Sequence, residues 1–169
     1  MKNLFLMAVI ALTTFSCSPK NEKSVTTTDP HMFGQNYDST ANMDAIKATF
    51  DDMEAYNLDS YVKKYADTAV FFDNGKKTTL AENVAVQKNL IASGIKVKVN
   101  RDYAMWSSHF NFKDYTQGDY VYSYVTVNFS KGDKKADIVF FQGDKFNKDG
   151  KITDEYLVYD QSALAPLMK

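Results

Sequence analysis

Hydrophobic residues recur at helical spacing in two stretches near the start of the folded part of the chain. Across residues 40–55, apolar side chains fall on one helix face and charged residues surround them. A shorter helix follows, for which Asn57 is a suitable cap. The apolar residues are Met43, Ile46, Phe50 and Met53 in the first helix, and Leu58, Tyr61, Val62 and Tyr65 in the second.

A third helix is predicted from a capping box, Thr79-Leu80-Ala81-Glu82, in which the first and last side chains satisfy each other's backbone amides. Gly94 suits the end of this helix. Its apolar residues are Val84, Val86, Leu90 and Ile91.

Strict alternation then replaces the helical spacing. Residues 95–99 alternate apolar with polar and predict a half-buried strand that continues towards Trp106. Turn residues at 130–133 and 147–151 predict hairpins into strands at 136–146 and 152–160. The longest strand, residues 120–129, has Val121, Val125, Val127 and Phe129 on one face and Tyr120, Tyr122, Tyr124 and Thr126 on the other. Helices followed by a strand meander predict an α+β fold, with the helices on one face of a curved antiparallel sheet.

Residues 57–75 carry the first candidate chemistry. The second helix leads into a turn at residues 66–68 and a buried strand at 69–72 that ends on Asp73. Phe71 and Phe72 beside this carboxylate would favour its neutral form and make it a proton carrier. The alternative is a plain Asp-Asn-Gly turn, and the pattern leaves both interpretations open.

The N-terminus predicts a cellular location. Residues 1–16 have the charge and the short apolar run of a signal peptide, and Ser16-Cys17 resembles a bacterial lipobox, although Thr14 stands where Leu is common. We therefore expect lipidated Cys17 and a flexible tether at 17–38, a folded domain at 39–169, and a lipid-anchored protein of the bacterial cell envelope. A plain secretory signal is the alternative, and the choice of membrane stays open.

Composition excludes several kinds of partner. The formal net charge is −1, and basic and acidic residues are interspersed, so no nucleic-acid partner is predicted. Cys17 is the only cysteine, which excludes an intramolecular disulfide. His109 is the only histidine of the predicted domain, so the sequence predicts neither a metal site nor a cofactor.

Four segments carry a resemblance to a known superfamily: Leu58-Asp59, Tyr65-Ala66-Asp67 with strand 69–73, residues 146–152, and Tyr159-Asp160. Over residues 40–165 the chain resembles the nuclear transport factor 2 (NTF2) superfamily, in its SnoaL-like and ketosteroid-isomerase-like branch. The resemblance implies a cone, in which a strongly bent sheet wraps three helices and encloses a pocket for a small, partly apolar molecule.

The same resemblance assigns candidate site residues. Asp73 falls on the aspartate that acts as base in ketosteroid isomerase, while Thr49 and Gln142 replace the two oxyanion donors of that enzyme. Loss of those donors argues against the steroid-isomerase reaction. His109 is a second catalytic candidate. The candidate pocket residues are Thr49, Tyr65, Phe71, Trp106, Tyr122, Phe140 and Gln142.

Three functions follow as expectations. The first is binding of a small apolar or amphipathic molecule in the cone. The second is an isomerase, cyclase or dehydratase that uses Asp73 as general base, and the sequence leaves open whether any reaction is catalysed. The third is a dimerising or partner-binding module that uses the outer face of the sheet.

Overall fold

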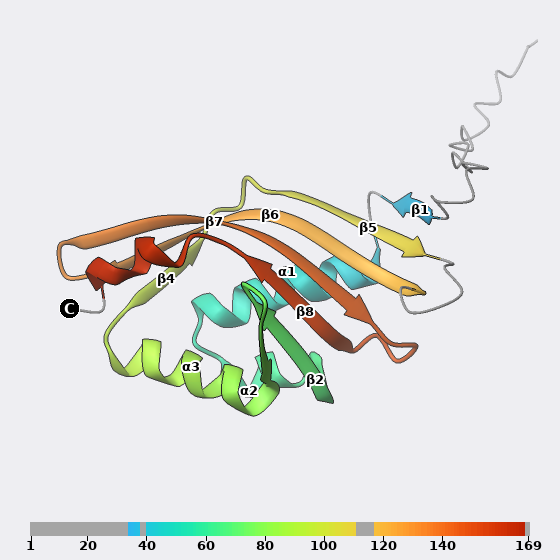
Figure 1. Ribbon diagram of the computed structural model, residues 1–169, viewed down its shortest axis with the longest axis horizontal. Helices are drawn as coiled ribbons and strands as arrows, with labels where there is room; N and C mark the ends of the chain where they lie inside the picture. Colours follow the sequence, from blue (N-terminus) through green and yellow to red (C-terminus); the bar gives the residue numbers. More distant parts are fainter. Residues whose placement is uncertain (1–33, 38–39, 111–116, 168–169) are drawn as a thin grey trace, which may run out of the picture.

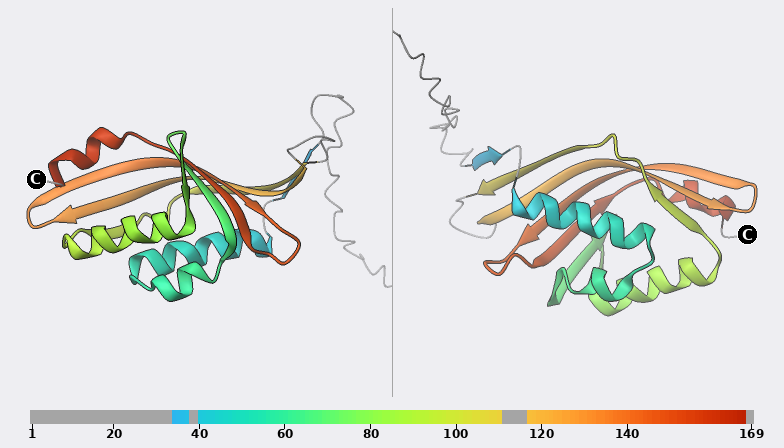
Figure 2. Two further views of the ribbon diagram at one scale, coloured as in Figure 1. Left: turned by 60° about the horizontal axis from the view of Figure 1, so that its bottom comes forward. Right: turned by 180° about the vertical axis from the view of Figure 1, so that it is seen from behind.

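The computed structural model describes residues 34–37, 40–110 and 117–167 of the 169-residue chain. The predicted signal peptide, Cys17 and nearly all of the predicted tether lie outside these residues. Within them, one bent sheet carries three helices on its concave side (Figure 1; Figure 2). This is the predicted α+β cone, with all three helices preceding the long strands.

Each helix begins at a side chain that satisfies free backbone amides. The Thr40 hydroxyl accepts a hydrogen bond from the Met43 amide at 3.2 Å, and Asn57 caps the second helix. Thr79 and Glu82 form the predicted capping box. The helices are α1 (Ala41–Glu54), α2 (Leu58–Val62) and α3 (Leu80–Ala92).

The sheet has eight strands in the order β1-β5-β6-β7-β8-β2-β3, and β4 pairs with β6 beside β5. Their bounds are β1 (Gly34–Tyr37), β2 (Tyr65–Asp73), β3 (Lys76–Thr79), β4 (Lys96–Val99), β5 (Ala104–Phe110), β6 (Gly118–Lys131), β7 (Lys134–Phe146) and β8 (Ile152–Val158). The prediction of an all-antiparallel sheet is wrong at one place, because β2 runs parallel to β8. The segment after α2 joins the sheet beside the C-terminal strand and in the same direction.

The two faces of β6 are those that the alternation predicts. Val121, Val125, Val127 and Phe129 are buried against the helices, and they form the core with Met43, Ile46 and Phe50 of α1. The tyrosines of β6 point to the convex side, where Tyr124 keeps 52% of its surface exposed. The structure thus decides which face of the strand is internal.

Two predicted boundaries differ from the structure. Residues 66–68 belong to β2 and not to a turn, since a register irregularity between Tyr65 and Val70 lets the strand begin at Tyr65. The strand expected to run from Ile95 towards Trp106 is broken at residues 100–103. Its halves, β4 and β5, pair in succession with the same strand β6.

Helix α3 is the least buried of the three helices. It packs against β2, β3 and α2, and none of its side chains is fully buried. Leu90 contacts the core, whereas Val86 is 57% exposed and Ile91 is also exposed. Of the apolar residues predicted for this helix, only some face the interior.

None of the helices in the described parts of the chain is long and apolar enough to span a bilayer.

The turn after Asp73 forms hydrogen bonds with the C-terminal segment. Asn74 (φ 47°) and Gly75 (φ 85°) form the two-residue turn between β2 and β3. The Asn74 side chain donates to the Tyr159 carbonyl oxygen at 2.9 Å and accepts from the Tyr159 amide at 3.0 Å. Beyond Tyr159, the 3₁₀ helix η1 (Gln161–Leu167) packs on β7.

We expect Asn74→Ala to lower the free energy of unfolding by about 2 kcal/mol, because it removes both hydrogen bonds and puts an alanine at positive φ. Asn74→Gly removes the same bonds but tolerates that backbone, so it should cost about 1 kcal/mol less. Urea denaturation measures both variants. Equal losses would contradict the contribution assigned to the backbone conformation.

Candidate functional site

Two carboxyl groups lie opposite each other on the concave face of the sheet. Asp144 of β7 pairs across the strands with Glu155 of β8, and their exposed fractions are 0% and 5%. The alternation of β7 places Asp144 inside, because Phe140, Gln142 and Phe146 on the same face are also buried. The sheet therefore holds two acidic side chains together in the interior.

A pair of tyrosines covers Glu155. The Tyr65 hydroxyl donates to Glu155 Oε2 at 2.5 Å and lies 2.9 Å from the Tyr61 hydroxyl. Tyr61 in turn donates to Asn83 Oδ1 of α3 at 3.3 Å. This series of polar contacts links the carboxyl pair to α2 and α3.

Asp144 has a different partner. The Gln142 amide nitrogen donates to both Asp144 carboxyl oxygens, at 3.2 and 3.0 Å. Across the strands from Gln142 lies Ser123 of β6, which is only 1% exposed. The Ser123 hydroxyl makes no hydrogen bond within the described residues. A buried hydroxyl without a partner is unusual in a folded protein.

Burial controls the ionisation of this cluster. Burial raises the pKa of Glu155 to about 7, against the opposing effect of the Tyr65 hydrogen bond, and the charge of Asp73 raises it further. Burial and then the charge of Glu155 raise the pKa of Asp144 well above its ordinary value, while the Gln142 hydrogen bond lowers it. Burial also raises the pKa of Tyr61 and of Tyr65, so both hydroxyls stay protonated near neutral pH.

Asp73, the predicted base, lies on the same concave face as this cluster. It comes two residues after the buried Phe71, which is the parallel-strand neighbour of Glu155. Its half-buried carboxylate accepts hydrogen bonds from the Tyr159 hydroxyl at 3.1 Å and from Gln161 at 3.3 Å. Asp73 therefore holds the C-terminal segment through hydrogen bonds, and its charge, in addition to burial, raises the pKa of Glu155.

Five of the predicted pocket residues are buried in the interior: Thr49, Tyr65, Phe71, Phe140 and Gln142. Of these, Tyr65 and Gln142 contact the carboxyl pair directly. The Thr49 hydroxyl donates to the Ile46 carbonyl oxygen at 2.7 Å. The Thr49 hydroxyl proton is therefore used in a hydrogen bond within α1 and not in a bond to the carboxyl pair.

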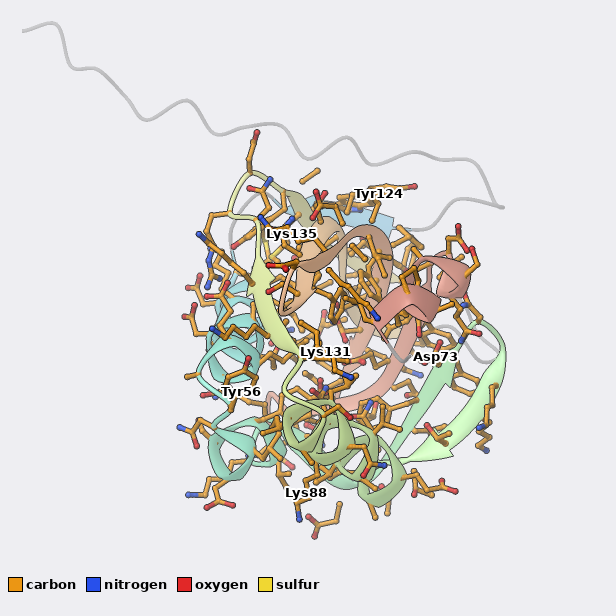
Figure 3. All side chains as sticks on the ribbon, turned by 90° about the vertical axis from the view of Figure 1, so that its left-hand side faces the viewer. Tyr56, Asp73, Lys88, Tyr124, Lys131 and Lys135 are labelled. Atoms are coloured by element: carbon orange, nitrogen blue, oxygen red, sulfur yellow. The ribbon has the colours of Figure 1, made fainter. Side chains whose placement is uncertain are left out.

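The structure does not bring the remaining candidates to this cluster. Trp106 and Tyr122 stack with ring centroids 5.7 Å apart, and both lie on the convex face, on the side where Tyr124 is labelled in Figure 3. Lys88 of α3 is labelled on the opposite side of the sheet in that view. His109 lies near the end of β5, with Nδ1 2.7 Å from Asp119 Oδ1, and three strands separate β5 from β2.

Sequence analysis did not identify Asp144, Glu155 or Ser123 as site residues. A signal for Asp144 exists in the sequence, because a carboxylate stands at every-second-residue spacing with Phe140, Gln142 and Phe146. No comparable signal marks Glu155, since a register irregularity in the pairing of β7 with β8 interrupts the alternation before it. Among the described residues, no group of three or more His, Cys, Asp or Glu side chains could hold a metal ion.

Comparison with known proteins gives likeness of structure only. No family model matches the sequence, and no curated protein matches it significantly. A provisionally assigned SnoaL-like polyketide cyclase from Shewanella putrefaciens is 14% identical with a TM-score of 0.56, and the match covers 78% of this chain and 87% of that one. An NTF2-like protein of unknown function from Exiguobacterium is 18% identical, with a TM-score of 0.55 and coverage of 69% and 98%.

An LEH-like epoxide hydrolase from M. tuberculosis is 12% identical, with a TM-score of 0.54 and coverage of 75% and 87%. At sequence identities between 12% and 18%, these similarities show a shared fold alone.

We expect ionisation of Glu155 to destabilise the folded chain. Its pKa is about 7 in the folded state and about 4.3 when unfolded. Between these values the folded chain binds more protons, so stability falls as pH rises. The loss is on the order of 3 kcal/mol by about pH 8.

Glu155→Gln removes this ionisation. The unfolding free energy of the wild type minus that of Glu155→Gln should therefore decrease between about pH 4 and pH 8, as measured by urea denaturation. A difference that stays constant over this range would contradict the raised pKa.

Proposed function

We propose that this chain, which has the NTF2-like and SnoaL-like fold, binds a small, partly apolar molecule between its bent sheet and its helices. In this proposal the Asp144 and Glu155 carboxyls hold a polar group of the molecule. The observation that carries the proposal is the burial of these two carboxyls opposite each other.

Stability alone does not account for this pair. Moving a carboxyl group from water into an apolar interior costs free energy, and two adjacent acids add repulsion when both are ionised. Apolar residues of similar volume at such positions are often neutral or stabilising. Buried acids with shifted pKa values are typical of functional sites, where their ionisation is used.

The surroundings suit a partly apolar ligand. Aromatic rings lie next to the pair, with Tyr61 and Tyr65 centroids 4.8 Å apart and Tyr65 and Phe71 centroids 5.1 Å apart. Helix α3, which contacts Tyr61 through Asn83, keeps partial exposure along the side that faces the interior. Because α3 is the helix beside the site with no fully buried side chain, we assign the ligand's entry to that side.

Native mass spectrometry tests the binding proposal. The full-length chain purified from its own host should carry a small molecule, and Asp144→Asn and Glu155→Gln should each reduce its occupancy. Asp154→Asn is the control. This carboxylate is adjacent in sequence to Glu155, but its charge, in addition to burial, raises the pKa of Tyr120 and Tyr156 on the outer face. An empty wild-type spectrum, together with no binding of the neutral probe 1-naphthylmethanol, would contradict the proposal.

A second candidate function is proton transfer on a carbonyl compound, favoured by the pKa of about 7 for Glu155. Ionised Glu155 would take a proton from the carbon beside a carbonyl, and neutral Asp144 would donate a hydrogen bond to the carbonyl oxygen. Return of the proton to the same or a neighbouring carbon completes exchange or isomerisation.

Deuterium exchange into 2-tetralone in D₂O, followed by NMR, measures this activity. We expect exchange above the buffer rate for the wild type and at least a 100-fold loss for Glu155→Gln, in the range typical of a removed general base. Asp73→Asn should retain most of the rate, because Tyr159 and Gln161 occupy its carboxylate. Greater sensitivity to Asp73→Asn than to Glu155→Gln would assign the role of base to Asp73 instead.

We also propose that Cys17 is lipidated and holds the domain at a cell-envelope membrane, as the signal-like N-terminus suggests. The mature wild type should then partition into the detergent phase of Triton X-114, whereas Cys17→Ser should partition into the aqueous phase. A wild type that remains in the aqueous phase would favour a plain secretory signal.

A further inference from the structure

We infer that the interior site takes a ligand with an amine group, bound as an ammonium cation among Asp144, Glu155, Gln142 and Ser123. This inference rests on the proposed binding of a small, partly apolar molecule and names the chemical class of its polar group. It depends on three features of the concave face: its charges, its free hydrogen-bond acceptors and its aromatic rings.

The charges on this face are acidic. Asp73, Asp144 and Glu155 come from β2, β7 and β8, and none of them takes part in an ion pair among the described residues. No Lys, Arg or His of the described chain is buried. Lys131 is the nearest basic residue along the inward face of β6, but it lies eight residues from Ser123, on the order of 25 Å along the strand.

The Lys131 ammonium donates to the Leu167 carbonyl oxygen, at the far end of the molecule. Once either acid is ionised, an anionic ligand group would be repelled at the carboxyl pair, whereas a cation would be attracted. In a low-dielectric interior this difference is larger than in water.

Acceptor atoms outnumber free donors among the hydrogen-bonding groups at the site. The Tyr65 hydroxyl donates to Glu155, and the Gln142 amide nitrogen donates to Asp144. The remaining groups are the Gln142 amide oxygen and the carboxyl oxygens, which accept, and the Ser123 hydroxyl, which can accept as well as donate. An ammonium group has three donors and no acceptor, so it complements this set.

The Ser123 hydroxyl points to a ligand independently of the acids. It is 99% buried, directly opposite Gln142 and without a hydrogen bond in the described residues. Such a group lowers the stability of the folded state unless a partner arrives. A ligand N–H that reaches the carboxyl pair past Gln142 would supply that partner.

Aromatic rings complete the environment of a cation. Tyr61, Tyr65 and Phe71 form a continuous row of rings beside Glu155, with centroid separations of 4.8 and 5.1 Å. Ring faces attract ammonium groups, and the attraction increases when water is excluded. These rings therefore favour the charged group as well as the apolar part of an amine.

Binding of an ammonium should release protons. The acids that face the site are Asp144 from β7, Glu155 from β8 and Asp73 from β2, and Tyr61, Tyr65 and Tyr159 stay protonated because burial raises their pKa. Near and below neutral pH the carboxyl pair holds protons that an arriving cation displaces. Affinity for an amine should therefore increase as pH rises towards 8, with proton release measurable by calorimetry in buffers of different ionisation enthalpy.

The test uses three probes with the same ring and different head groups: 1-naphthylmethylamine, 1-naphthylmethanol and 1-naphthoate. Each is titrated into the full-length chain by isothermal calorimetry. At about pH 7.5 the amine should bind at least tenfold more tightly than the alcohol, and the acid should bind least. Amine affinity should fall at least tenfold by about pH 5.5.

Variants separate the site from general effects. Glu155→Gln or Asp144→Asn should reduce the preference for amine over alcohol to threefold or less, and either variant suffices if the other fails to fold. Asp154→Asn should leave it unchanged. Ser123→Ala should weaken amine binding at least threefold while raising the unfolding midpoint without ligand, because it removes the unpartnered hydroxyl.

Tighter binding of the alcohol or the acid than of the amine, lost in Glu155→Gln, would overturn the amine inference and leave the proposed binding function intact. Proton uptake instead of release on amine binding would also overturn it. Failure of all three probes to bind, together with an empty native mass spectrum, would overturn the binding function itself.

Discussion

The antiparallel pairing of β6 with β7 is the constraint on which the rest of the structure depends. These two strands are the longest in the sheet, with 14 and 13 residues, and their pairing is continuous from Asp119 with Phe146 to Lys131 with Lys134. Both β4 and β5 pair with β6, while β8 pairs with β7. A slip of one residue in this hairpin would exchange the core face with the aromatic outer face.

The same register creates the polar cluster. The alternation that buries Phe140 and Phe146 also buries Asp144, and the pairing of β7 with β8 places Glu155 opposite it. Parallel addition of β2 then brings Phe71 beside Glu155, on the strand that carries Tyr65. The sheet thus concentrates groups that lower its own stability in one part of the interior, a trade-off that is common at functional sites.

The two faces of the sheet suit different kinds of interaction. The concave face combines an apolar core with buried acids, and α3, which packs on it, has no fully buried side chain. The convex face carries an aromatic cluster, and several of its large side chains remain exposed: Tyr124, Val139, Tyr156 and Val158. The predicted dimerising or partner-binding role would use this convex face, so it competes with neither ligand binding nor proton transfer.

By itself, the sequence determined the helices, the caps at Asn57 and Thr79, the turn at Asn74 and Gly75, and the grouping of side chains on each face of β6. These features depend on local periodicity and on backbone preferences within a few residues. Resemblance to the NTF2-like superfamily supplied the cone, and it also indicated that Tyr65 and Gln142 lie inside.

Only the tertiary structure decided which face is internal and which strands are neighbours. Alternation shows that Trp106 or Tyr122 shares a face with other residues of its strand, but it does not say on which side the helices pack. The meeting of Asp144 with Glu155, and of Tyr65 with a residue 90 positions later, depends on register between separate strands. The pKa of a carboxyl group depends on these non-local neighbours and on burial, so the chemistry of the site could not be predicted from the spacing of residues along the chain.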